Sequence, residues 1–257
     1  MTSVNSAILF RPSNRVWALG LPLLLIAALL LPVTERLDFY LADALYLPGT
    51  GFIGKHSVFL EAWLHSHAKR VVILFGLLVL AGWLISLRYA CWEAYRRPLG
   101  YLVMALALST VIVTPLKALT AVHCFWDLAQ HGGEEIYTPL LAERAPTLKP
   151  GRCWPGGHAS SGFSLFALYF LFRDTRPRLA RGLLVGALLF GSLLSLGRML
   201  QGAHFLSHNL WTAAFDWLIC LGCYRWLLYC PENPASQRLS LGDTPSHRPP
   251  SANIADT

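Results

Sequence analysis

The segment Gly197–Trp211, GRMLQGAHFLSHNLW, has residue types and a spacing suited to phosphoryl transfer. Arg198 precedes His204 by six residues, and His208 follows His204 by four. A histidine attacks phosphorus when one ring nitrogen is unprotonated, and an acceptor on the other nitrogen fixes that tautomer. Residues four apart share a helix face, so His208 is a candidate for this acceptor. We interpret His204 as a nucleophile and Arg198 as a phosphate ligand.

Two further polar segments supply the other groups that this chemistry needs. In GRCWPGGHASSG, Gly151–Gly162, His158 follows two glycines and is a candidate to protonate a departing oxygen. Gly157 allows a backbone N–H to approach an oxyanion, and Lys117, at the end of an apolar run, adds a positive charge. Polar groups between apolar runs are costly unless they face water or a binding site. We therefore expect the three segments to form one phosphate site.

Less specific interpretations exist for each residue taken singly. A lysine or arginine at the end of an apolar run often only extends to the membrane interface. The spacing of His204 and His208 also suits a metal, with His123 or His158 as a third ligand. That alternative leaves Lys117 without a role and lacks carboxylates beside the pair. We predict neither a metal nor another cofactor.

Composition indicates what must position these residues. Of 257 residues, 54% are hydrophobic and 14% are charged, against about 25% charged in a typical soluble domain. Little charge, gathered between long apolar runs, predicts a polytopic membrane protein. The net charge of +7 then reports orientation and contact with anionic lipid. No basic run interleaved with aromatic residues suggests a nucleic-acid partner.

Six apolar runs predict an all-α fold, a bundle of six transmembrane helices with a long outer loop between helices 3 and 4. The runs are Val16–Val33, Val71–Leu87, Leu99–Leu116, His158–Phe172, Gly182–Leu196 and Asn209–Tyr229. The mixed segment Thr34–Arg70 contains a predicted interfacial helix at Phe59–Trp63. Residues 1–230 are predicted to form a membrane-embedded domain, and the Pro/Ser-rich residues 231–257 a disordered cytoplasmic tail.

Arginines set the expected orientation. With six spans, both termini share a side with two short connections, and this side carries Arg11, Arg15, Arg88, Arg96, Arg97, Arg173, Arg176, Arg178 and Arg181. The positive-inside rule makes it cytoplasmic. The three polar segments then fall on the outer face, where Cys124 and Cys153 are expected to form a disulfide. We predict a multi-pass protein of the bacterial inner membrane with its site facing the periplasm.

The three segments together resemble the motifs of the type 2 phosphatidic acid phosphatase superfamily, which includes integral membrane lipid phosphatases. Those motifs are K-x6-R-P, P-S-G-H and S-R-x5-H-x3-D. PGGH at Pro155–His158 resembles the second, and Gly197–His208 resembles the third, with histidine in place of its aspartate. Lys117 matches the first motif, but Cys124 and Phe125 stand at its Arg-Pro positions. The resemblance covers approximately Val71–Tyr229.

The resemblance implies His204 as nucleophile, His158 as general acid, and Lys117, Gly157 and Arg198 as phosphate ligands. It implies an activity without a metal or cofactor.

Two departures from the motifs change the expected chemistry. His208 can accept a hydrogen bond from His204 but lacks the fixed charge of an aspartate, which predicts pH-sensitive activity. Loss of the first-motif arginine removes a bidentate phosphate clamp. Arg152 is a candidate replacement. Asp127 and Glu134 are candidate carboxylate partners, although solvated loop charges are commoner.

The resulting hypothesis is a lipid phosphatase. It would hydrolyse a phosphomonoester or pyrophosphate of a lipid head group through a phosphohistidine. Lipid A, phosphatidate, phosphatidylglycerol phosphate and undecaprenyl pyrophosphate are all candidate substrates, and no residue selects among them. The alternatives are a lipid-to-lipid phosphotransferase that uses the same site and a non-catalytic lipid-phosphate binder or transporter. The expected partners are a lipid phosphate and membrane lipids, and the sequence does not indicate an oligomeric state.

Overall fold

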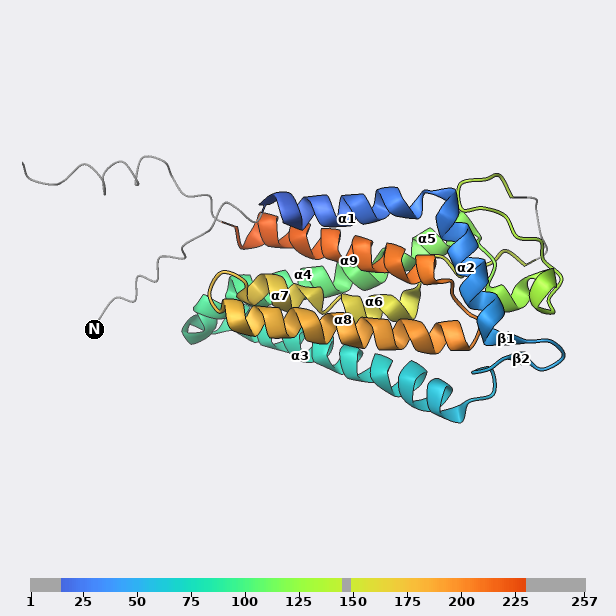
Figure 1. The fold of residues 1–257 in the computed structure, drawn as a ribbon. Helices are drawn as coiled ribbons and strands as arrows, with labels where there is room; N and C mark the ends of the chain where they lie inside the picture. Colours follow the sequence, from blue (N-terminus) through green and yellow to red (C-terminus); the bar gives the residue numbers. More distant parts are fainter. Residues whose placement is uncertain (1–14, 145–148, 230–257) are drawn as a thin grey trace, which may run out of the picture.

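The structure is a computed structural model that describes residues 15–144 and 149–229, and most of its helices run along a common axis (Figure 1). The helices are α1 (Arg15–Leu29), α2 (Pro32–Leu45), α3 (Ala68–Arg88), α4 (Arg96–Val111), α5 (Val113–Thr120), α6 (Gly157–Phe163), α7 (Phe166–Phe172), α8 (Pro177–Leu200) and α9 (Leu206–Leu227). Shorter helical segments are η2 (Phe59–His67), η3 (Ala90–Tyr95), η4 (Phe125–Asp127) and η5 (Ala129–His131). A two-stranded antiparallel pair joins β1 (Tyr46–Leu47) to β2 (Gly51–Phe52). The mostly helical chain agrees with the expected helical fold, and the predicted tail at 231–257 lies outside the described residues.

The apolar runs form helices, with two differences from the prediction. Residues Val16–Val33 do not form one straight span, because α1 ends at Leu29 and the chain bends by 75° into α2. Pro32 begins α2, and proline favours the first turn of a new helix because it has no N–H for the preceding one. Phe59–Trp63 is not a separate interfacial helix, because η2 continues directly into α3 as one helix, Phe59–Arg88.

Length and hydropathy identify candidate membrane spans. Among the described residues, three helices are long and apolar enough to cross a membrane: Phe59–Arg88, Ala90–Asp127 and Pro177–Leu200. The bent pair α1–α2 adds a fourth if it counts as one span. Several long apolar helices thus indicate a membrane protein, whereas the count of six spans and the long outer loop stay predictions.

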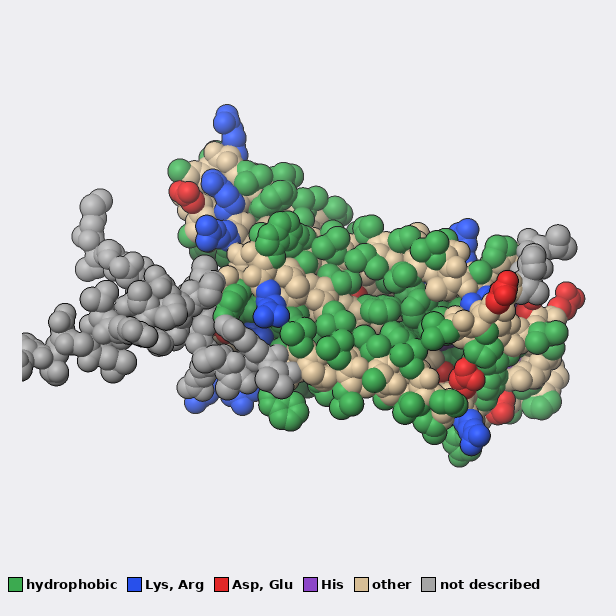
Figure 2. Space-filling view, turned by 90° about the horizontal axis from the view of Figure 1, so that it is seen from above, with side chains coloured by type: hydrophobic (Ala, Val, Ile, Leu, Met, Phe, Trp, Pro, Cys, Tyr) green, Lys and Arg blue, Asp and Glu red, His purple; other side chains and the backbone are tan. Residues whose placement is uncertain are grey.

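The two ends of the bundle differ in chemistry. The start of α1, the turn from α3 to α4, the connection from α7 to α8 and the end of α9 lie at one end (Figure 1). The helix α2, the β1–β2 pair, the start of α6 and the residues between α8 and α9 lie at the other. Figure 2 shows basic side chains mostly toward the first end, acidic ones mostly toward the second, and apolar ones between. The arginine-rich connections and the polar segments are therefore at opposite ends.

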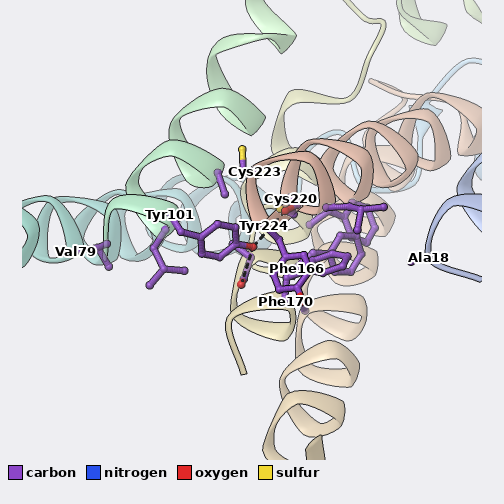
Figure 3. Close-up of a cluster of buried hydrophobic side chains, with 14 of the residues drawn as sticks. Ala18, Val79, Tyr101, Phe166, Phe170, Cys220, Cys223 and Tyr224 are labelled. Atoms are coloured by element: carbon purple, nitrogen blue, oxygen red, sulfur yellow. Dashed lines mark hydrogen bonds between the residues drawn. The ribbon is translucent and has the colours of Figure 1, made fainter. Parts of the chain in front are cut away.

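A cluster of buried apolar side chains joins the helices along the bundle (Figure 3). Phe166 and Phe170 of α7 pack in this cluster with Tyr101 of α4, and all three are at most 2% exposed. The hydroxyl oxygen of Tyr101 lies 3.1 Å from the carbonyl oxygen of Ala167 and 3.4 Å from that of Cys220. A buried hydroxyl with such partners avoids a desolvation cost, and it links α4 to α7 and α9.

A close approach of two glycines sets the spacing between α6 and α8. A Cβ on Gly162 of α6 would clash with the backbone of Gly191 on α8, so only glycine allows this contact. The helix α6 carries His158 and α8 carries Arg198. The backbone contact therefore helps to place these two side chains at the same end of the bundle.

Candidate active site

His204 lies in the short connection between α8 and α9 and is 2% exposed. Its Nδ1 is 2.8 Å from the carbonyl oxygen of Cys153. A carbonyl oxygen can only accept, so Nδ1 carries the proton and Nε2 of the neutral ring is bare. An imidazole with one bare nitrogen is the form that acts as a nucleophile.

Lys117, near the end of α5, lies against the first turn of α6. Its Nζ would be 3.3 Å from a Cβ on Gly157, so any side chain at this position would crowd the ammonium group. The neighbouring Gly156 is equally restricted, because a Cβ there would be 2.6 Å from Oδ1 of the buried Asn209. This contact explains physically why glycine stands at the serine position of the second motif.

Arg198 occupies the last turn of α8 and is held by side chains from three other segments. Its Nη1 donates to Oε1 of Gln201 at 2.8 Å, and Nε2 of Gln201 donates to Oε2 of Glu61 at 3.0 Å. The guanidinium carbon lies 5.6 Å from the ring centroid of Trp126, within cation–π range. Sequence reasoning missed these three partners. Gln201 alone had a local signal, because it lies three residues after Arg198.

A cavity of about 590 Å³ opens beside Lys117, Gly157 and His158. The half-buried His158 reaches it from the first turn of α6. The walls from α3, α4 and α5 are largely apolar, and Ser161 and Ser164 add two hydroxyl groups at α6. Two of the expected phosphate ligands and the expected general acid thus border one space.

Burial and nearby charges favour the neutral form of His204. Burial lowers the pKa of His204 well below its usual 6.5, and the positive charges of Lys117, His208, Arg198 and His158 lower it further, in that order. A positive neighbour disfavours the imidazolium form, and burial does the same. The neutral ring that nucleophilic attack needs is therefore favoured. The segments themselves touch through the His204–Cys153 hydrogen bond and through the approach of Lys117 to Gly157.

His208 has a different position from the one expected of an acceptor. Its ring centroid is 6.1 Å from that of His204, and the single N–H of neutral His204 is already directed at Cys153. The backbone carbonyl of His208 instead accepts from N–H of Gly156 at 3.3 Å and from Oγ1 of Thr212 at 2.9 Å. The sequence-based role of His208 as acceptor is therefore replaced by the Cys153 carbonyl.

Asp38, a residue that sequence reasoning passed over, fixes the start of α9. Its Oδ1 accepts the backbone N–H of Ser207 at 2.9 Å, within the first turn of α9. A carboxylate at a helix N-terminus satisfies a free donor and complements the helix dipole. The bend between α1 and α2 thus brings an acidic side chain next to the connection that carries His204.

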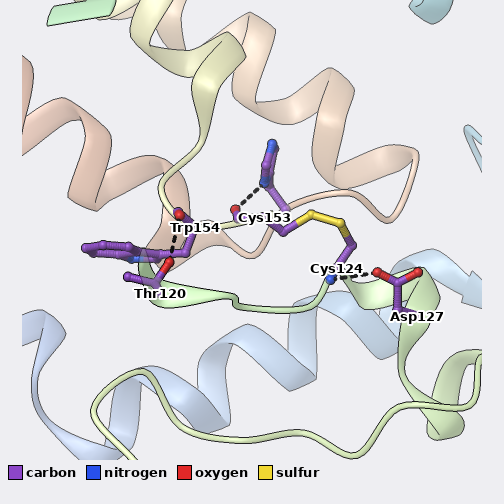
Figure 4. The surroundings of a disulfide bond; sticks show 6 residues. Thr120, Cys124, Asp127, Cys153 and Trp154 are labelled. Atoms are coloured by element: carbon purple, nitrogen blue, oxygen red, sulfur yellow. Dashed lines mark hydrogen bonds between the residues drawn. A yellow bond between two sulfur atoms is a disulfide. The ribbon is translucent and has the colours of Figure 1, made fainter. Parts of the chain in front are cut away.

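The first-motif positions serve structure in this chain. Cys124 forms the predicted disulfide with Cys153, with their Cα atoms 5.1 Å apart, which confirms the pairing (Figure 4). Phe125 is 1% exposed and packs in an aromatic cluster with Phe52 and Phe205. Asp127 accepts the backbone N–H of Cys124 at 3.0 Å, so it caps η4. At the positions where the first motif has arginine and proline, this chain therefore has a disulfide-bonded cysteine and a packed phenylalanine ring.

The remaining candidates do not join the group around His204. Arg152 and Glu134 are exposed, and the charges that act on His204 come from other residues. Nε2 of His123 lies 3.6 Å from Oε2 of Glu135, within the loop. Within residues 15–144 and 149–229, no three His, Cys, Asp or Glu side chains gather as a metal site would require.

Comparison with known families agrees with this geometry. The sequence model of the PAP2 superfamily matches residues 98–232, slightly more than half of the chain. The chain belongs to the PAP2 superfamily. The match begins near the start of α4 and leaves α1, α2 and α3 outside it. Searches of curated proteins and of solved structures gave no match.

Membership of the PAP2 superfamily implies phosphatase-type activity on a phosphorylated substrate. Lys117, His158, Arg198 and His204 all lie within the matched residues. Glu61 and Asp38, which support Arg198 and the start of α9, lie outside them. The segment before the match therefore contributes to positioning the site.

Proposed function

We propose that the protein is a metal-independent phosphatase of the bacterial inner membrane that hydrolyses a phosphomonoester or pyrophosphate of a lipid head group at the periplasmic face. The observation that carries this proposal is the cavity of about 590 Å³ next to Lys117 and His158. It joins groups suited to a phosphate with an apolar passage between α3 and α4. A soluble phosphorylated substrate would have no use for the apolar part.

The walls of the cavity suit a hydrocarbon chain. They include Ile73, Leu77 and Leu80 of α3 and Val103 and Leu106 of α4. Burial of a methylene group contributes about 0.8 kcal/mol, so several carbons of one chain would add substantially to binding. We assign the phosphate to the end with Lys117 and the first carbons of the hydrocarbon chain to the apolar part.

The first chemical step uses the bare Nε2 of His204. A bond forms between Nε2 and phosphorus, the bond from phosphorus to the lipid oxygen breaks, and that oxygen takes a proton from His158. Lys117, Arg198 and the N–H of Gly157 neutralise the charge on the non-bridging oxygens. Water then attacks the phosphohistidine, gives a proton to His158, and releases inorganic phosphate and neutral His204.

A panel of lipid phosphates tests this reaction. We expect purified protein in detergent or nanodiscs to release inorganic phosphate, also in the presence of a chelator, and His204→Ala to lower the rate by about a thousandfold or more. Unchanged phosphate release by folded His204→Ala would contradict the nucleophile. Transfer of labelled phosphate to a second lipid, without free phosphate, would favour the phosphotransferase. Binding without turnover would favour the non-catalytic binder.

A pair of glycine variants tests the apolar passage. Gly76 lines the cavity on α3, and Gly186 is exposed on α8, and a Cβ at either position meets no atom within 4 Å. We expect Gly76→Trp to fill the passage and lower kcat/KM for a long-chain lipid phosphate about tenfold. Activity on water-soluble para-nitrophenyl phosphate should persist. Gly186→Trp is the matched control, and equal effects of both variants on the lipid would contradict the proposed chain position.

A further inference from the structure

His204 lacks the acceptor that its motif provides. The aspartate position of the third motif holds His208, and the ring of His208 receives no N–H from His204. A ring without a fixed acceptor exchanges between two tautomers and reorients, and only one arrangement presents a bare nitrogen to phosphorus. Another group must therefore hold the ring if it is to attack efficiently.

We propose that the backbone carbonyl of Cys153, held in place by the Cys124–Cys153 disulfide, takes over the task of that aspartate. It accepts the Nδ1 proton of His204 at 2.8 Å and leaves Nε2 bare. His204 is 2% exposed and Cys153 is 5% exposed, so water does not compete for this hydrogen bond. The inference rests on the proposed function, because holding the ring matters for turnover only if His204 is the nucleophile.

Three attachments fix the position of this carbonyl. The disulfide joins Cys153 to Cys124 (Figure 4). The N–H of Cys153 donates to the carbonyl oxygen of Val122 at 2.9 Å. The carbonyl oxygen of Trp154 accepts from Oγ1 of Thr120 at 3.1 Å. Residues 153 and 154 are thus fastened to the chain that leaves α5. A backbone acceptor tied at both neighbouring peptides has little freedom to move.

The same attachment connects the acceptor to a phosphate ligand. Lys117 lies three residues before Thr120, on the helix that leads into the disulfide. Breaking the disulfide would release one of the three attachments, on the side of Cys124. Phosphate binding through Lys117 and Arg198 would persist, whereas the ring of His204 would lose a fixed acceptor. Turnover, more than binding, should therefore depend on the disulfide.

Serine substitutions test this dependence in the full chain. We expect Cys124→Ser with Cys153→Ser to lower kcat about tenfold and to leave KM for a lipid phosphate within about twofold. Thiol reduction of the unmodified protein should have the same effect. The matched control is Cys91→Ser, which removes an exposed free thiol. An unchanged kcat in the double variant overturns the proposal.

A rescue separates positioning from simple stabilisation. Adding His208→Asp to the double serine variant returns a carboxylate to the motif position, and we expect it to recover most of the lost kcat. A disulfide that only stabilises the fold would not be replaced by a carboxylate at position 208. Failure of the rescue in folded protein, with kcat and KM changed together, overturns the positioning role of the Cys153 carbonyl.

The tautomer of His204 can be measured without any variant of the disulfide. Nitrogen NMR of the full-length protein, labelled with ¹⁵N-histidine and free of substrate, should show His204 protonated at Nδ1 and bare at Nε2. The loss of its signals in His204→Ala gives the assignment. A proton on Nε2 overturns the inference even if phosphate is released. The expected tautomer without phosphate release would instead count against the proposed function, so the two failures are distinguishable.

Discussion

Two groups of buried polar side chains in this protein have opposite charge balances. At the end of the bundle, His204 is surrounded by Lys117, His208, Arg198 and His158, and each of their charges lowers its pKa. In the interior, the carboxylate of Asp216 on α9 lies beside the hydroxyl of Ser160 on α6, which donates to the backbone carbonyl of Ser109 on α4. The first group carries a surplus of positive charge, and the second carries a potential negative charge with neutral partners.

The interior group makes part of its hydrogen bonds within the protein, whereas Oγ of Ser109 and Oδ2 of Asp216 are buried without a hydrogen-bond partner in the part of the chain that the structure describes. Asp216 is 1% exposed, and its Oδ1 lies 3.3 Å from Oγ of Ser160. The same Oγ donates to the carbonyl oxygen of Ser109 at 2.8 Å. These bonds link α4, α6 and α9 below the site.

The basic group at the end of the bundle is compensated in part by an exposed carboxylate. Glu61 comes within 3.9 Å of Arg198, but the Glu61 side chain is 60% exposed and therefore screened by solvent. Buried charges of one sign are costly unless an opposite charge joins them. An anion bound between Lys117 and Arg198 would supply it. The comparison therefore predicts that surplus charge, rather than burial of polar atoms, marks the proposed phosphate site in this bundle.

Replacement of Arg198 by lysine tests the basic group most strongly. Arg198→Lys keeps the charge but loses the planar guanidinium that can donate two parallel hydrogen bonds to a phosphate. We expect kcat/KM for a lipid phosphate to fall about a hundredfold in a phosphate-release assay. Arg178→Lys, an exposed position at the opposite end of the same helix, should stay within about twofold. Equal losses in the two variants would break the comparison.

Removal of the Lys117 charge sharpens the comparison through pH dependence. Burial and then the Lys117 ammonium lower the pKa of His204 below its usual 6.5, so the ring stays neutral as the pH falls past this value. In the pH profile of kcat/KM, the fall on the acid side (the acid limb) that reports protonation of His204 should therefore lie below pH 6.5. In Lys117→Met the pKa of His204 rises toward 6.5, and this limb should move to higher pH.

A control lysine in the same cavity makes this result specific. Lys69 also lines the cavity, but its charge is not among those that lower the pKa of His204. Lys69→Met should leave the acid limb in place, whatever its effect on KM. An acid limb that stays unchanged in Lys117→Met, or that moves equally in both variants, would contradict the assigned electrostatic role of Lys117.

Much of this arrangement could be predicted from the sequence because it depends on local patterns. Apolar runs predicted most of the helices, and the polar segments pointed to Lys117, His158 and Arg198, whose charges act on His204. Cys124 and Cys153 were predicted to pair from their place in one polar loop, and the structure confirms it. Pro32 was a local signal for the bend between α1 and α2, but the length of the apolar run outweighed it.

The remaining features depend on tertiary contacts that no local pattern shows. Glu61 and Asp38 support the site from segments far away in sequence, and only folding brings them near Gln201 and Ser207. The acceptor for His204 is a backbone carbonyl, which every residue carries, so its identity leaves no mark in the residue types. Reasoning from side chains alone therefore assigned this task to the nearest polar side chain in the motif.

The interior carboxylate gives the smallest expected effect and completes the comparison. Asp216→Asn keeps the shape of the side chain and a hydrogen-bonding group beside Oγ of Ser160, and adds an N–H that can face Oγ of Ser109, which is unpartnered among the described residues. We expect phosphate release within about twofold of the unmodified protein and a change in the free energy of unfolding below about 1 kcal/mol. Asp216→Leu removes the acceptor and should lower that free energy by about 1–3 kcal/mol, with kcat/KM of the folded protein retained. A large loss of turnover in stably folded Asp216→Asn would mean that the interior carboxylate takes part in the reaction, and the distinction between a charged binding group and a structural one would then fail.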